Sequence, residues 1–455
     1  MEMVLEFLRD VLSQPALLIG IMSCVGLVAL KRPFHKVMTG TLKPILGYLM
    51  LAAGAGVIVS NLDPLGKMIE HGFHITGVEP NNEAIVAVAQ KVLGVETMSI
   101  LVVGLLMNLC IARFTKFKYV FLTGHHSLFM ACLMSAVLGT AGLSGMELIL
   151  VGGFLMGAWS AISPAIGQSY TSKVTDGDEI AIGHFGSLGY YLSAWVAQYV
   201  GKAEDSTEDI EIPEKWGFLR DSTLSTALTM IVFYLIAAIA AGSEFVSTLS
   251  GDMSPYLYAV MSAMNFAVGV TIVYSGVRMI LGDLIPAFQG IATKIIPNAI
   301  PAVDCAVFFT YAPTAVVLGF LSSFIGGIIG MLILGAVGGV LIIPGLVPHF
   351  FCGATAGIYG NATGGRRGAA VGAFLNGLAI TFLPAMALPV LGQLGFQNTT
   401  FGDADFAVMG LVLGNAYEWV GMAGIYGIVA IAALVLIIPN FIKTKGKVIN
   451  YVEED

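Results

Sequence analysis

Apolar segments long enough to cross a lipid bilayer recur along almost the entire chain. A hydrocarbon core of about 30 Å requires roughly 17 to 25 mainly apolar residues in a helix. Hydrophobic residues make up 57% of the sequence and charged residues only 11%, whereas about a quarter of the residues are charged in ordinary soluble domains. We therefore predict an all-α, polytopic membrane protein with about eleven transmembrane helices, plus re-entrant hairpins where glycine or proline breaks a helix. The predicted spans are Leu17–Lys31, Val37–Ser60, Thr97–Ala112, Val120–Leu138, Met146–Ile166, Ser225–Ser243, Tyr256–Leu281, Val303–Phe320, Ile325–Ile343, Arg367–Leu388 and Val408–Ile438.

Basic residues cluster after three of the predicted spans. Short loops rich in lysine and arginine usually stay in the cytoplasm. We therefore predict that all three clusters lie in the cytoplasm. This requires an N-terminus outside, a cytoplasmic C-terminal tail (443–455) and an odd number of spans. The clusters are Lys31, Arg32 and Lys36; Arg113, Lys116 and Lys118; and Lys443, Lys445 and Lys447.

The remaining composition excludes several classes of protein. The net charge of −8 gives no basic surface for nucleic acid. The five cysteines are scattered among apolar segments without a CxxC pair, which indicates small core residues rather than a disulfide frame or a metal site. No Walker, GxGxxG, HExxH or GxSxG motif indicates a soluble catalytic domain.

The two halves of the chain share a weak repeat. "AGAGVIVSNLDPL" at Ala53–Leu65 and "SGVRMILGDLIPA" at Ser275–Ala287 have a glycine, a leucine and a proline at identical spacing. Farther on, Glu83 and Asp304 each lie three residues after a proline and would be repeat partners. Five predicted spans precede the polar stretch in the middle and six follow it, so the halves would be inverted relative to each other, a frequent plan in transporters.

We therefore predict three regions. Residues 1–222 form the first inverted repeat and include a cytoplasmic central loop at 201–221, residues 223–442 form the second repeat and the last span, and 443–455 form the tail.

A few polar residues lie in otherwise apolar sequence. Ionisable groups at membrane depth are costly and usually line a pathway or a polar cavity. His125 and His126 occur in "TGHHSLF" and His184 in "IAIGHFGSLGYY", while Glu83 and Asp304 follow proline-marked breaks. Imidazole donates and accepts hydrogen bonds, which suits a hydroxylated ligand. Two alternatives stay open for these residues. The acids can bind a ligand or cap broken helices, and one of the two adjacent histidines can instead bond to a backbone carbonyl. The aromatic residues nearby suit either the core or a sugar face; they are Phe129, Phe185, Tyr190 and Tyr191.

Four longer motifs carry a family resemblance. "LTGHH", "TDGDEIAIGH", "AVDCAVFFTYAPTAVVLGF" and "LIIPGLVPHFFCGATAGIYGN" resemble the membrane component, IIC, of the ascorbate-type phosphotransferase system. The resemblance extends from "GIMSCVGLVALK" at Gly20–Lys31 to the last span. It implies a homodimeric elevator-type transporter of the bacterial inner membrane. Both repeats would contribute to a core domain, which carries the substrate across the bilayer, and to a dimerisation domain.

The resemblance also implies the mode of coupling. The substrate, a sugar, sugar acid or polyol, would be phosphorylated by a IIB protein that IIA has charged. The chain contains no attached IIB or IIA domain, so it would be a transport subunit, not an enzyme, and would need no cofactor or metal.

The family's binding positions fall on the polar residues already singled out. The implied substrate-binding residues are Asn82, Glu83, His125, His126, Phe129, His184, Phe185 and Asp304. The chain departs from the family pattern at Phe129, Phe185, Ala55 and Glu83, where other members carry glutamine, serine or tyrosine. Ascorbate is a monoanion at neutral pH, and Glu83 beside Asp304 would repel it. The predicted substrate is therefore ascorbate or a related sugar or polyol, and these departures lead to the hypothesis that a neutral compound is transported in place of ascorbate.

Two other functions compete with this one. A secondary transporter driven by Na⁺ or H⁺ would also use inverted repeats and midplane carboxylates. An intramembrane metalloenzyme would hold zinc through His125, His184 and Asp304 with one position open.

Overall fold

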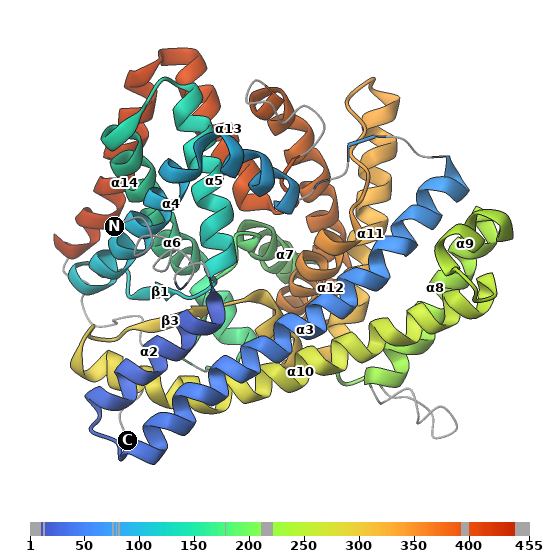
Figure 1. The fold of residues 1–455 in the computed structure, drawn as a ribbon, viewed down its shortest axis with the longest axis horizontal. Helices are drawn as coiled ribbons and strands as arrows, with labels where there is room; N and C mark the ends of the chain where they lie inside the picture. Colours follow the sequence, from blue (N-terminus) through green and yellow to red (C-terminus); the bar gives the residue numbers. More distant parts are fainter. Residues whose placement is uncertain are drawn as a thin grey trace.

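The chain folds into a bundle of long helices around a very small parallel sheet (Figure 1). The computed structural model describes residues 11, 14–74, 77, 78, 80, 82–177, 179–210, 222–392 and 400–441. The first half contains helices α2 (Pro15–Ala29), α3 (Phe34–Phe73), α4 (Asn82–Phe114), α5 (Gly124–Thr140), α6 (Gly145–Val174) and α7 (Ser187–Val200). The second half contains α8 (Ser222–Ala241), α9 (Ser243–Ser250), α10 (Pro255–Lys294), the 3₁₀ helix η2 (Cys305–Thr310), α11 (Pro313–Ala336), α12 (Leu346–Gly392), α13 (Ala404–Val420) and α14 (Met422–Phe441).

Seven helices of the described part are long and apolar enough to cross a membrane, and an eighth is added if α8 and α9, which meet at 117°, form one bent span. The polytopic membrane protein is therefore confirmed, whereas the predicted number of eleven spans is not. The seven are α3, residues 95–114 of α4, α6, residues 255–284 of α10, α11, residues 346–389 of α12, and α14.

Several predicted spans have different boundaries in the structure. Val303–Phe320 and Ile325–Ile343 were predicted as two spans, but a single helix, α11, covers the middle of this region and begins at Pro313. Proline is favoured at the first position of a helix, because a backbone N–H at that position would have no partner within the helix. The predicted span Val408–Ile438 is divided between α13 and α14 at Gly421, which has a φ of 63°. Apolar composition does not reveal such breaks.

The described part of the chain is mostly helical, as predicted, but it also contains a small three-stranded parallel sheet that was not predicted. The strands are β1 (Tyr119–Phe121), β2 (Ala181–Ile182) and β3 (Ile300–Val303), in the order β1-β3-β2. Tyr119 pairs with Ile300, and Ala181 pairs with Ala302. The span predicted at Val120–Leu138 therefore starts as a buried strand, and its helix, α5, has only 17 residues. Strand pairing satisfies backbone groups that are shielded from water in this region.

Helices α3 and α10 pack closely along their length (Figure 1). A Cβ atom on Gly47 would lie 2.8 Å from the carbonyl oxygen of Gly276, and one on Gly54 would lie 2.8 Å from that of Gly269. As the residue number rises on α3 it falls on α10, so the two helices are antiparallel. Small residues allow this close approach of two backbones.

The predicted central loop, 201–221, is described as far as residue 210 and contains no helix or strand in that part; residues 211–221 lie outside the described residues. The backbone N–H of Arg366 donates to the carbonyl oxygen of Asp205 at 2.8 Å. Arg366 directly follows Gly364 and Gly365, whose non-helical backbone divides α12 into two arms. The loop therefore packs on the tip of a helical hairpin.

Replacing Glu208 with alanine is expected to destabilise the fold by about 1 kcal/mol, the usual effect of losing a helix cap. The Glu208 carboxylate accepts hydrogen bonds from the backbone N–H groups of Thr314 at 3.0 Å and Ala315 at 3.1 Å, in the first turn of α11. Thermal unfolding of the purified protein measures the effect. Glu204→Ala, which removes an exposed acid of the same loop, is the control, and equal stability of the two variants would contradict the capping role.

Candidate functional site

The three strands end at one edge of the sheet, and a polar residue follows each end. His125 and His126 come shortly after β1, His184 comes two residues after β2, and Asp304 directly follows β3. The carboxyl ends of parallel strands meet at the same edge, where ligands commonly bind. Residues from distant parts of the chain are therefore brought together here.

A cavity of about 400 Å³ lies at this edge, between the sheet, α3 and the start of α12. Six of the eight predicted site residues line it: Asn82, His125, His126, Phe129, His184 and Asp304. The other described lining residues are Tyr48, Leu51, Ala52, Ala55, Val59, Asp63, Pro80, Cys305, Ala306, Val347, Pro348, Phe351, Cys352 and Asp403. The cavity combines hydrogen-bonding groups with aromatic rings, a composition typical of sites for small polar molecules.

The two remaining predicted residues differ from this group. Phe185 is fully buried, and its ring stacks on Phe121 with 4.6 Å between the ring centroids. It is therefore a core residue behind the cavity, and its backbone N–H, not its ring, supports the site. Glu83 belongs to α4, but its side chain lies outside the described residues.

His125 connects α3 to the end of β3. Its Nδ1 lies 3.3 Å from the Tyr48 hydroxyl, and its Nε2 lies 3.5 Å from Oδ2 of Asp304. The other carboxylate oxygen of Asp304 accepts the backbone N–H of Ala306 at 3.1 Å. Asp304 thus caps the 3₁₀ helix, as one of the two alternatives predicted, and also lines the cavity.

His126 and His184 are held in one tautomer by the backbone. The N–H of Phe185 donates to Nδ1 of His126 at 3.3 Å, and the N–H of Gly186 donates to Nδ1 of His184 at 3.2 Å. A ring nitrogen that accepts a hydrogen bond carries no proton, so both rings are neutral and carry their proton on Nε2. The two rings contact each other with centroids 3.8 Å apart. Each histidine therefore offers one N–H donor.

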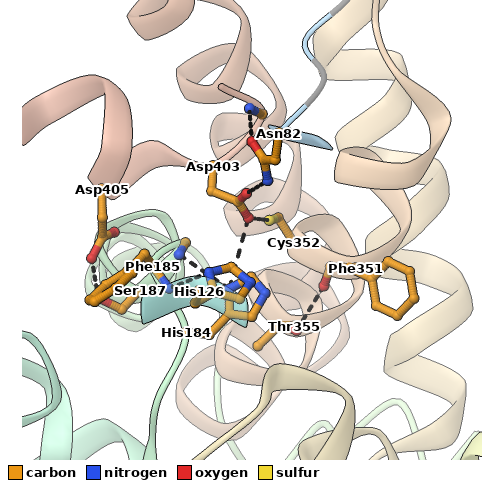
Figure 2. Close-up of polar contacts among 12 residues, drawn as sticks. Asn82, His126, His184, Phe185, Ser187, Phe351, Cys352, Thr355, Asp403 and Asp405 are labelled. Atoms are coloured by element: carbon orange, nitrogen blue, oxygen red, sulfur yellow. Dashed lines mark hydrogen bonds and ion pairs between the residues drawn. The ribbon is translucent and has the colours of Figure 1, made fainter. Parts of the chain in front are cut away.

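Asp403 is the main residue of the site that the sequence did not predict (Figure 2). Its carboxylate accepts hydrogen bonds from Nδ2 of Asn82 at 2.6 Å and from Sγ of Cys352 at 2.9 Å. Oδ1 of Asn82 in turn accepts the N–H of Gly402 at 2.9 Å. One oxygen of Asp403 lies 3.8 Å from Nδ1 of His184, but this contact is no ion pair, since the Gly186 N–H already donates to that nitrogen.

Asp405 supports the site from behind. Its carboxylate accepts a hydrogen bond from the Ser187 hydroxyl at 2.8 Å (Figure 2). It also accepts from the Leu188 N–H at 2.9 Å and from the Trp159 indole at 3.2 Å. These donors include the first turn of α7, so Asp405 fixes the segment that carries His184. Two aspartates at the start of an apolar helix, in "GDADF", were the signal in the sequence for both Asp403 and Asp405.

Two groups of side chains in the described part have metal-ligand atoms within 4.8 Å of one another: His126, His184 and Asp403, and His184, Asp304 and Cys305. A metal bound at Nε2 would require the proton of each ring to move to Nδ1. The buried N–H groups of Phe185 and Gly186 would then lose their acceptors, at a cost of roughly 1–3 kcal/mol each. The hydrogen bonding around the histidines therefore disfavours the metalloenzyme alternative.

Comparison with known proteins shows two similarities. Residues 10–405 match the model of the family EIIC-GAT, described as "PTS system sugar-specific permease component". A protein of Mycoplasma pneumoniae (strain ATCC 29342), named "Ascorbate-specific PTS system EIIC component", is 26% identical over 474 aligned positions, which cover 90% of this chain and 70% of the relative.

Proposed function

Since the chain belongs to the EIIC-GAT family, the sugar-specific permease component of the phosphotransferase system, we propose that its cavity carries a sugar, sugar acid or polyol inward for phosphorylation by a separate IIB protein. The family resemblance expected from the motifs is thus confirmed, and the chain is a IIC permease subunit. Phosphoryl transfer would be the task of IIB, which IIA recharges.

The observation that carries this proposal is the cavity at the carboxyl edge of the sheet. Imidazole N–H groups, the carboxylates of Asp304 and Asp403, and the ring of Phe129 line a space of about 400 Å³. Hydroxyl groups both donate and accept hydrogen bonds, so a polyhydroxylated ligand can satisfy donors and acceptors together. An aromatic ring beside such groups offers a flat apolar surface for the carbon-bound hydrogens of a sugar.

Two inverted repeats are part of the proposal. Helices α3 and α10 both contain 40 residues, and the reciprocal glycine pairs along them, Gly47 with Gly276 and Gly54 with Gly269, have the same spacing on each helix. Such reciprocal pairing is expected when a pseudo-twofold axis passes between two equivalent antiparallel helices. Each long helix is followed by a further helix, a helical hairpin and one more helix: α4, α5–α6 and α7 after α3, and α11, the two arms of α12 and α13 after α10.

The extended segments support the same arrangement. In the sheet, β3 lies between β1 and β2. In the other half, Val78 pairs with Ile342 and Pro80 pairs with Thr400, both in parallel, so this segment also lies between two partners. The flanking segments hold matching positions in the two halves. β1 precedes α5 as Ile342 precedes α12, and β2 precedes α7 as Thr400 precedes α13.

With this alignment, the candidate site would lie at the interface between the repeats. Asn82 and Asp304 hold equivalent positions after the two central segments, and His184 and Asp403 hold equivalent positions after two flanking segments. Asn82, and not Glu83 as the sequence comparison predicted, is then the repeat partner of Asp304. Substrate sites of inverted-repeat transporters commonly lie at such an interface.

The packing of the helices agrees with two domains. Helices α2, α3, α8 and α10 pack mainly on one another, while α4–α7 and α11–α13 pack together around the sheet and the cavity. We propose that the second group is a core domain that slides as an elevator along α3, whose face at the cavity carries the small side chains of Ala52, Ala55 and Val59. The first group would form the dimer contact. The N-terminus would lie outside and the C-terminus inside the bacterial inner membrane.

Uptake into proteoliposomes tests the function. We expect a radiolabelled substrate to accumulate only as its phosphate ester, and only when IIB, IIA and a phosphoryl donor are enclosed. Omitting IIB is the control. Accumulation of unmodified solute without IIB, driven by an imposed Na⁺ or H⁺ gradient, would overturn the proposal in favour of a secondary transporter.

A further inference from the structure

The charged side chains that line the substrate cavity are all acidic in the described part of the chain. They are Asp63, Asp304 and Asp403, and no lysine or arginine is among the described lining residues. Asp63 lies at one end of the cavity on α3, where it pairs with Lys67 at 3.1 Å. Asp304 and Asp403 are 8% and 5% exposed, so water screens their charges poorly.

The histidines at the cavity are placed as neutral hydrogen-bonding groups and not as cations that would offset these carboxylates. The Tyr48 hydroxyl lies 3.3 Å from Nδ1 of His125 and can donate to it, while Nε2 of the same ring faces Oδ2 of Asp304 at 3.5 Å. Backbone N–H groups donate to Nδ1 of both His126 and His184, so neither ring is positively charged in this arrangement. The two rings offer N–H donors, which attract oxygen atoms, but they provide no full positive charge. The cavity wall is therefore negative at the two buried aspartates.

Both aspartates keep acceptor capacity for a ligand. One oxygen of Asp403 accepts from Asn82 and the other from Cys352, while Asp304 accepts from the N–H of Ala306 and faces His125. A carboxylate has about four lone-pair sites, so each group retains free sites for hydroxyl donors.

We propose that the cavity selects an uncharged sugar or polyol over an anionic sugar such as ascorbate, and that Asp403 is a specificity-determining residue that binds a hydroxyl group together with Asp304. This inference rests on the proposed function and narrows it to a substrate class. Hydroxyl groups donate to both carboxylates without a charge penalty, whereas an anion would lie close to two poorly screened negative charges.

Two ligands of similar shape separate charge from size. L-Ascorbate and L-gulono-1,4-lactone share a five-membered lactone ring and the same side chain, but only ascorbate is an anion at neutral pH. We expect calorimetry on the purified full-length protein to show binding of the lactone, or of a neutral hexitol, pentitol or hexose in the same panel, at least about tenfold tighter than that of ascorbate, from like-charge repulsion. Ascorbate binding as tight as that of every neutral compound would overturn the inference.

Asp403→Asn tests the role of the residue. The amide has nearly the shape of the carboxylate but no charge, so neutral ligands should bind more weakly and ascorbate more tightly than to the wild-type protein. A purely structural role would weaken binding of both ligand classes equally, and that result would remove Asp403 from substrate selection. Asp283→Asn, which changes an aspartate of α10 paired with Lys43, is the matched control. If Asp403→Asn does not fold, the ligand pair on the wild-type protein still decides the charge selection.

Coupled uptake distinguishes the two levels of the proposal. IIB-dependent phosphorylation of ascorbate in preference to every neutral compound would preserve the permease function and overturn the inferred substrate class. Tight binding of a neutral compound whose uptake does not depend on IIB would preserve the inferred substrate class and overturn the permease function. Binding of no compound in either class would count against both.

Discussion

Asp304→Asn is expected to reduce phosphorylation-coupled uptake more than any other conservative change in the cavity. The aspartate faces Nε2 of His125 and also lines the cavity, so under the proposed function it would serve as a charged acceptor for both the ring and the ligand. Hydrogen bonds to charged groups contribute roughly 1.5–3 kcal/mol, so we expect ligand affinity to fall about 10- to 150-fold. Calorimetry with the best ligand of the panel, followed by IIB-dependent uptake, measures the loss.

Two further variants separate binding from folding. An asparagine retains an oxygen that can accept the Ala306 N–H, whereas Asp304→Ala also removes the cap of the 3₁₀ helix. Asp304→Asn should therefore unfold at nearly the wild-type temperature, and Asp304→Ala should be less stable. His125→Ala should weaken binding as well, since the ring lines the same cavity. Wild-type affinity in Asp304→Asn would show that the carboxylate does not touch the ligand.

Polarity in an apolar context was enough to find four of the polar residues of the cavity from the sequence. His125, His126, His184 and Asp304 were singled out because ionisable groups at membrane depth are costly, and the structure brings all four to one cavity. The parallel pairing of β1, β2 and β3 that brings them together was not predicted. Strands of two to four residues are too short to show an alternating pattern of polar and apolar positions.

Asp403 was missed for a different reason. It precedes α13, where an aspartate ordinarily serves as a helix cap, and its partners Asn82 and Cys352 are far away in the sequence. The pairing becomes visible only when the segment at Thr400 lies beside Pro80. Long-range contacts of this kind leave no local pattern in a single sequence.

The predicted number of eleven spans is not confirmed, and several predicted boundaries differ from those of the helices, because hydrophobicity is insensitive to backbone geometry. Gly421 divides one predicted span into α13 and α14, and Gly364 and Gly365 divide α12 into two arms. In a bilayer such breaks are tolerated where the freed backbone groups find partners within the protein. Beside the break in α12, for example, the backbone N–H of Arg366 finds such a partner in the carbonyl oxygen of Asp205.

Enlarging the side chain at Gly276 is expected to cause the largest loss of stability. A Cβ atom there would lie 2.6 Å from the carbonyl oxygen of Gly47 and 2.7 Å from the backbone nitrogen of Leu51. Both are backbone atoms of α3, so they cannot move aside like a flexible side chain, and the two helices would have to separate. Overpacking typically costs about 1–3 kcal/mol, and we expect Gly276→Ala to reach this range and Gly276→Leu to exceed it.

The same helix provides a matched control for this prediction. A Cβ atom on Gly282 would meet nothing within 4 Å, so Gly282→Ala adds the same methyl group to α10 without a steric conflict. Alanine is favoured over glycine in a helix by about 1 kcal/mol, so this variant should be as stable as the wild type or more so. Thermal unfolding in detergent, followed by size-exclusion chromatography, compares the variants. If Gly276→Ala and Gly282→Ala unfold at the same temperature, α3 and α10 do not pack as closely as the reciprocal glycine contacts require, and the pseudo-twofold axis proposed between them loses its main support.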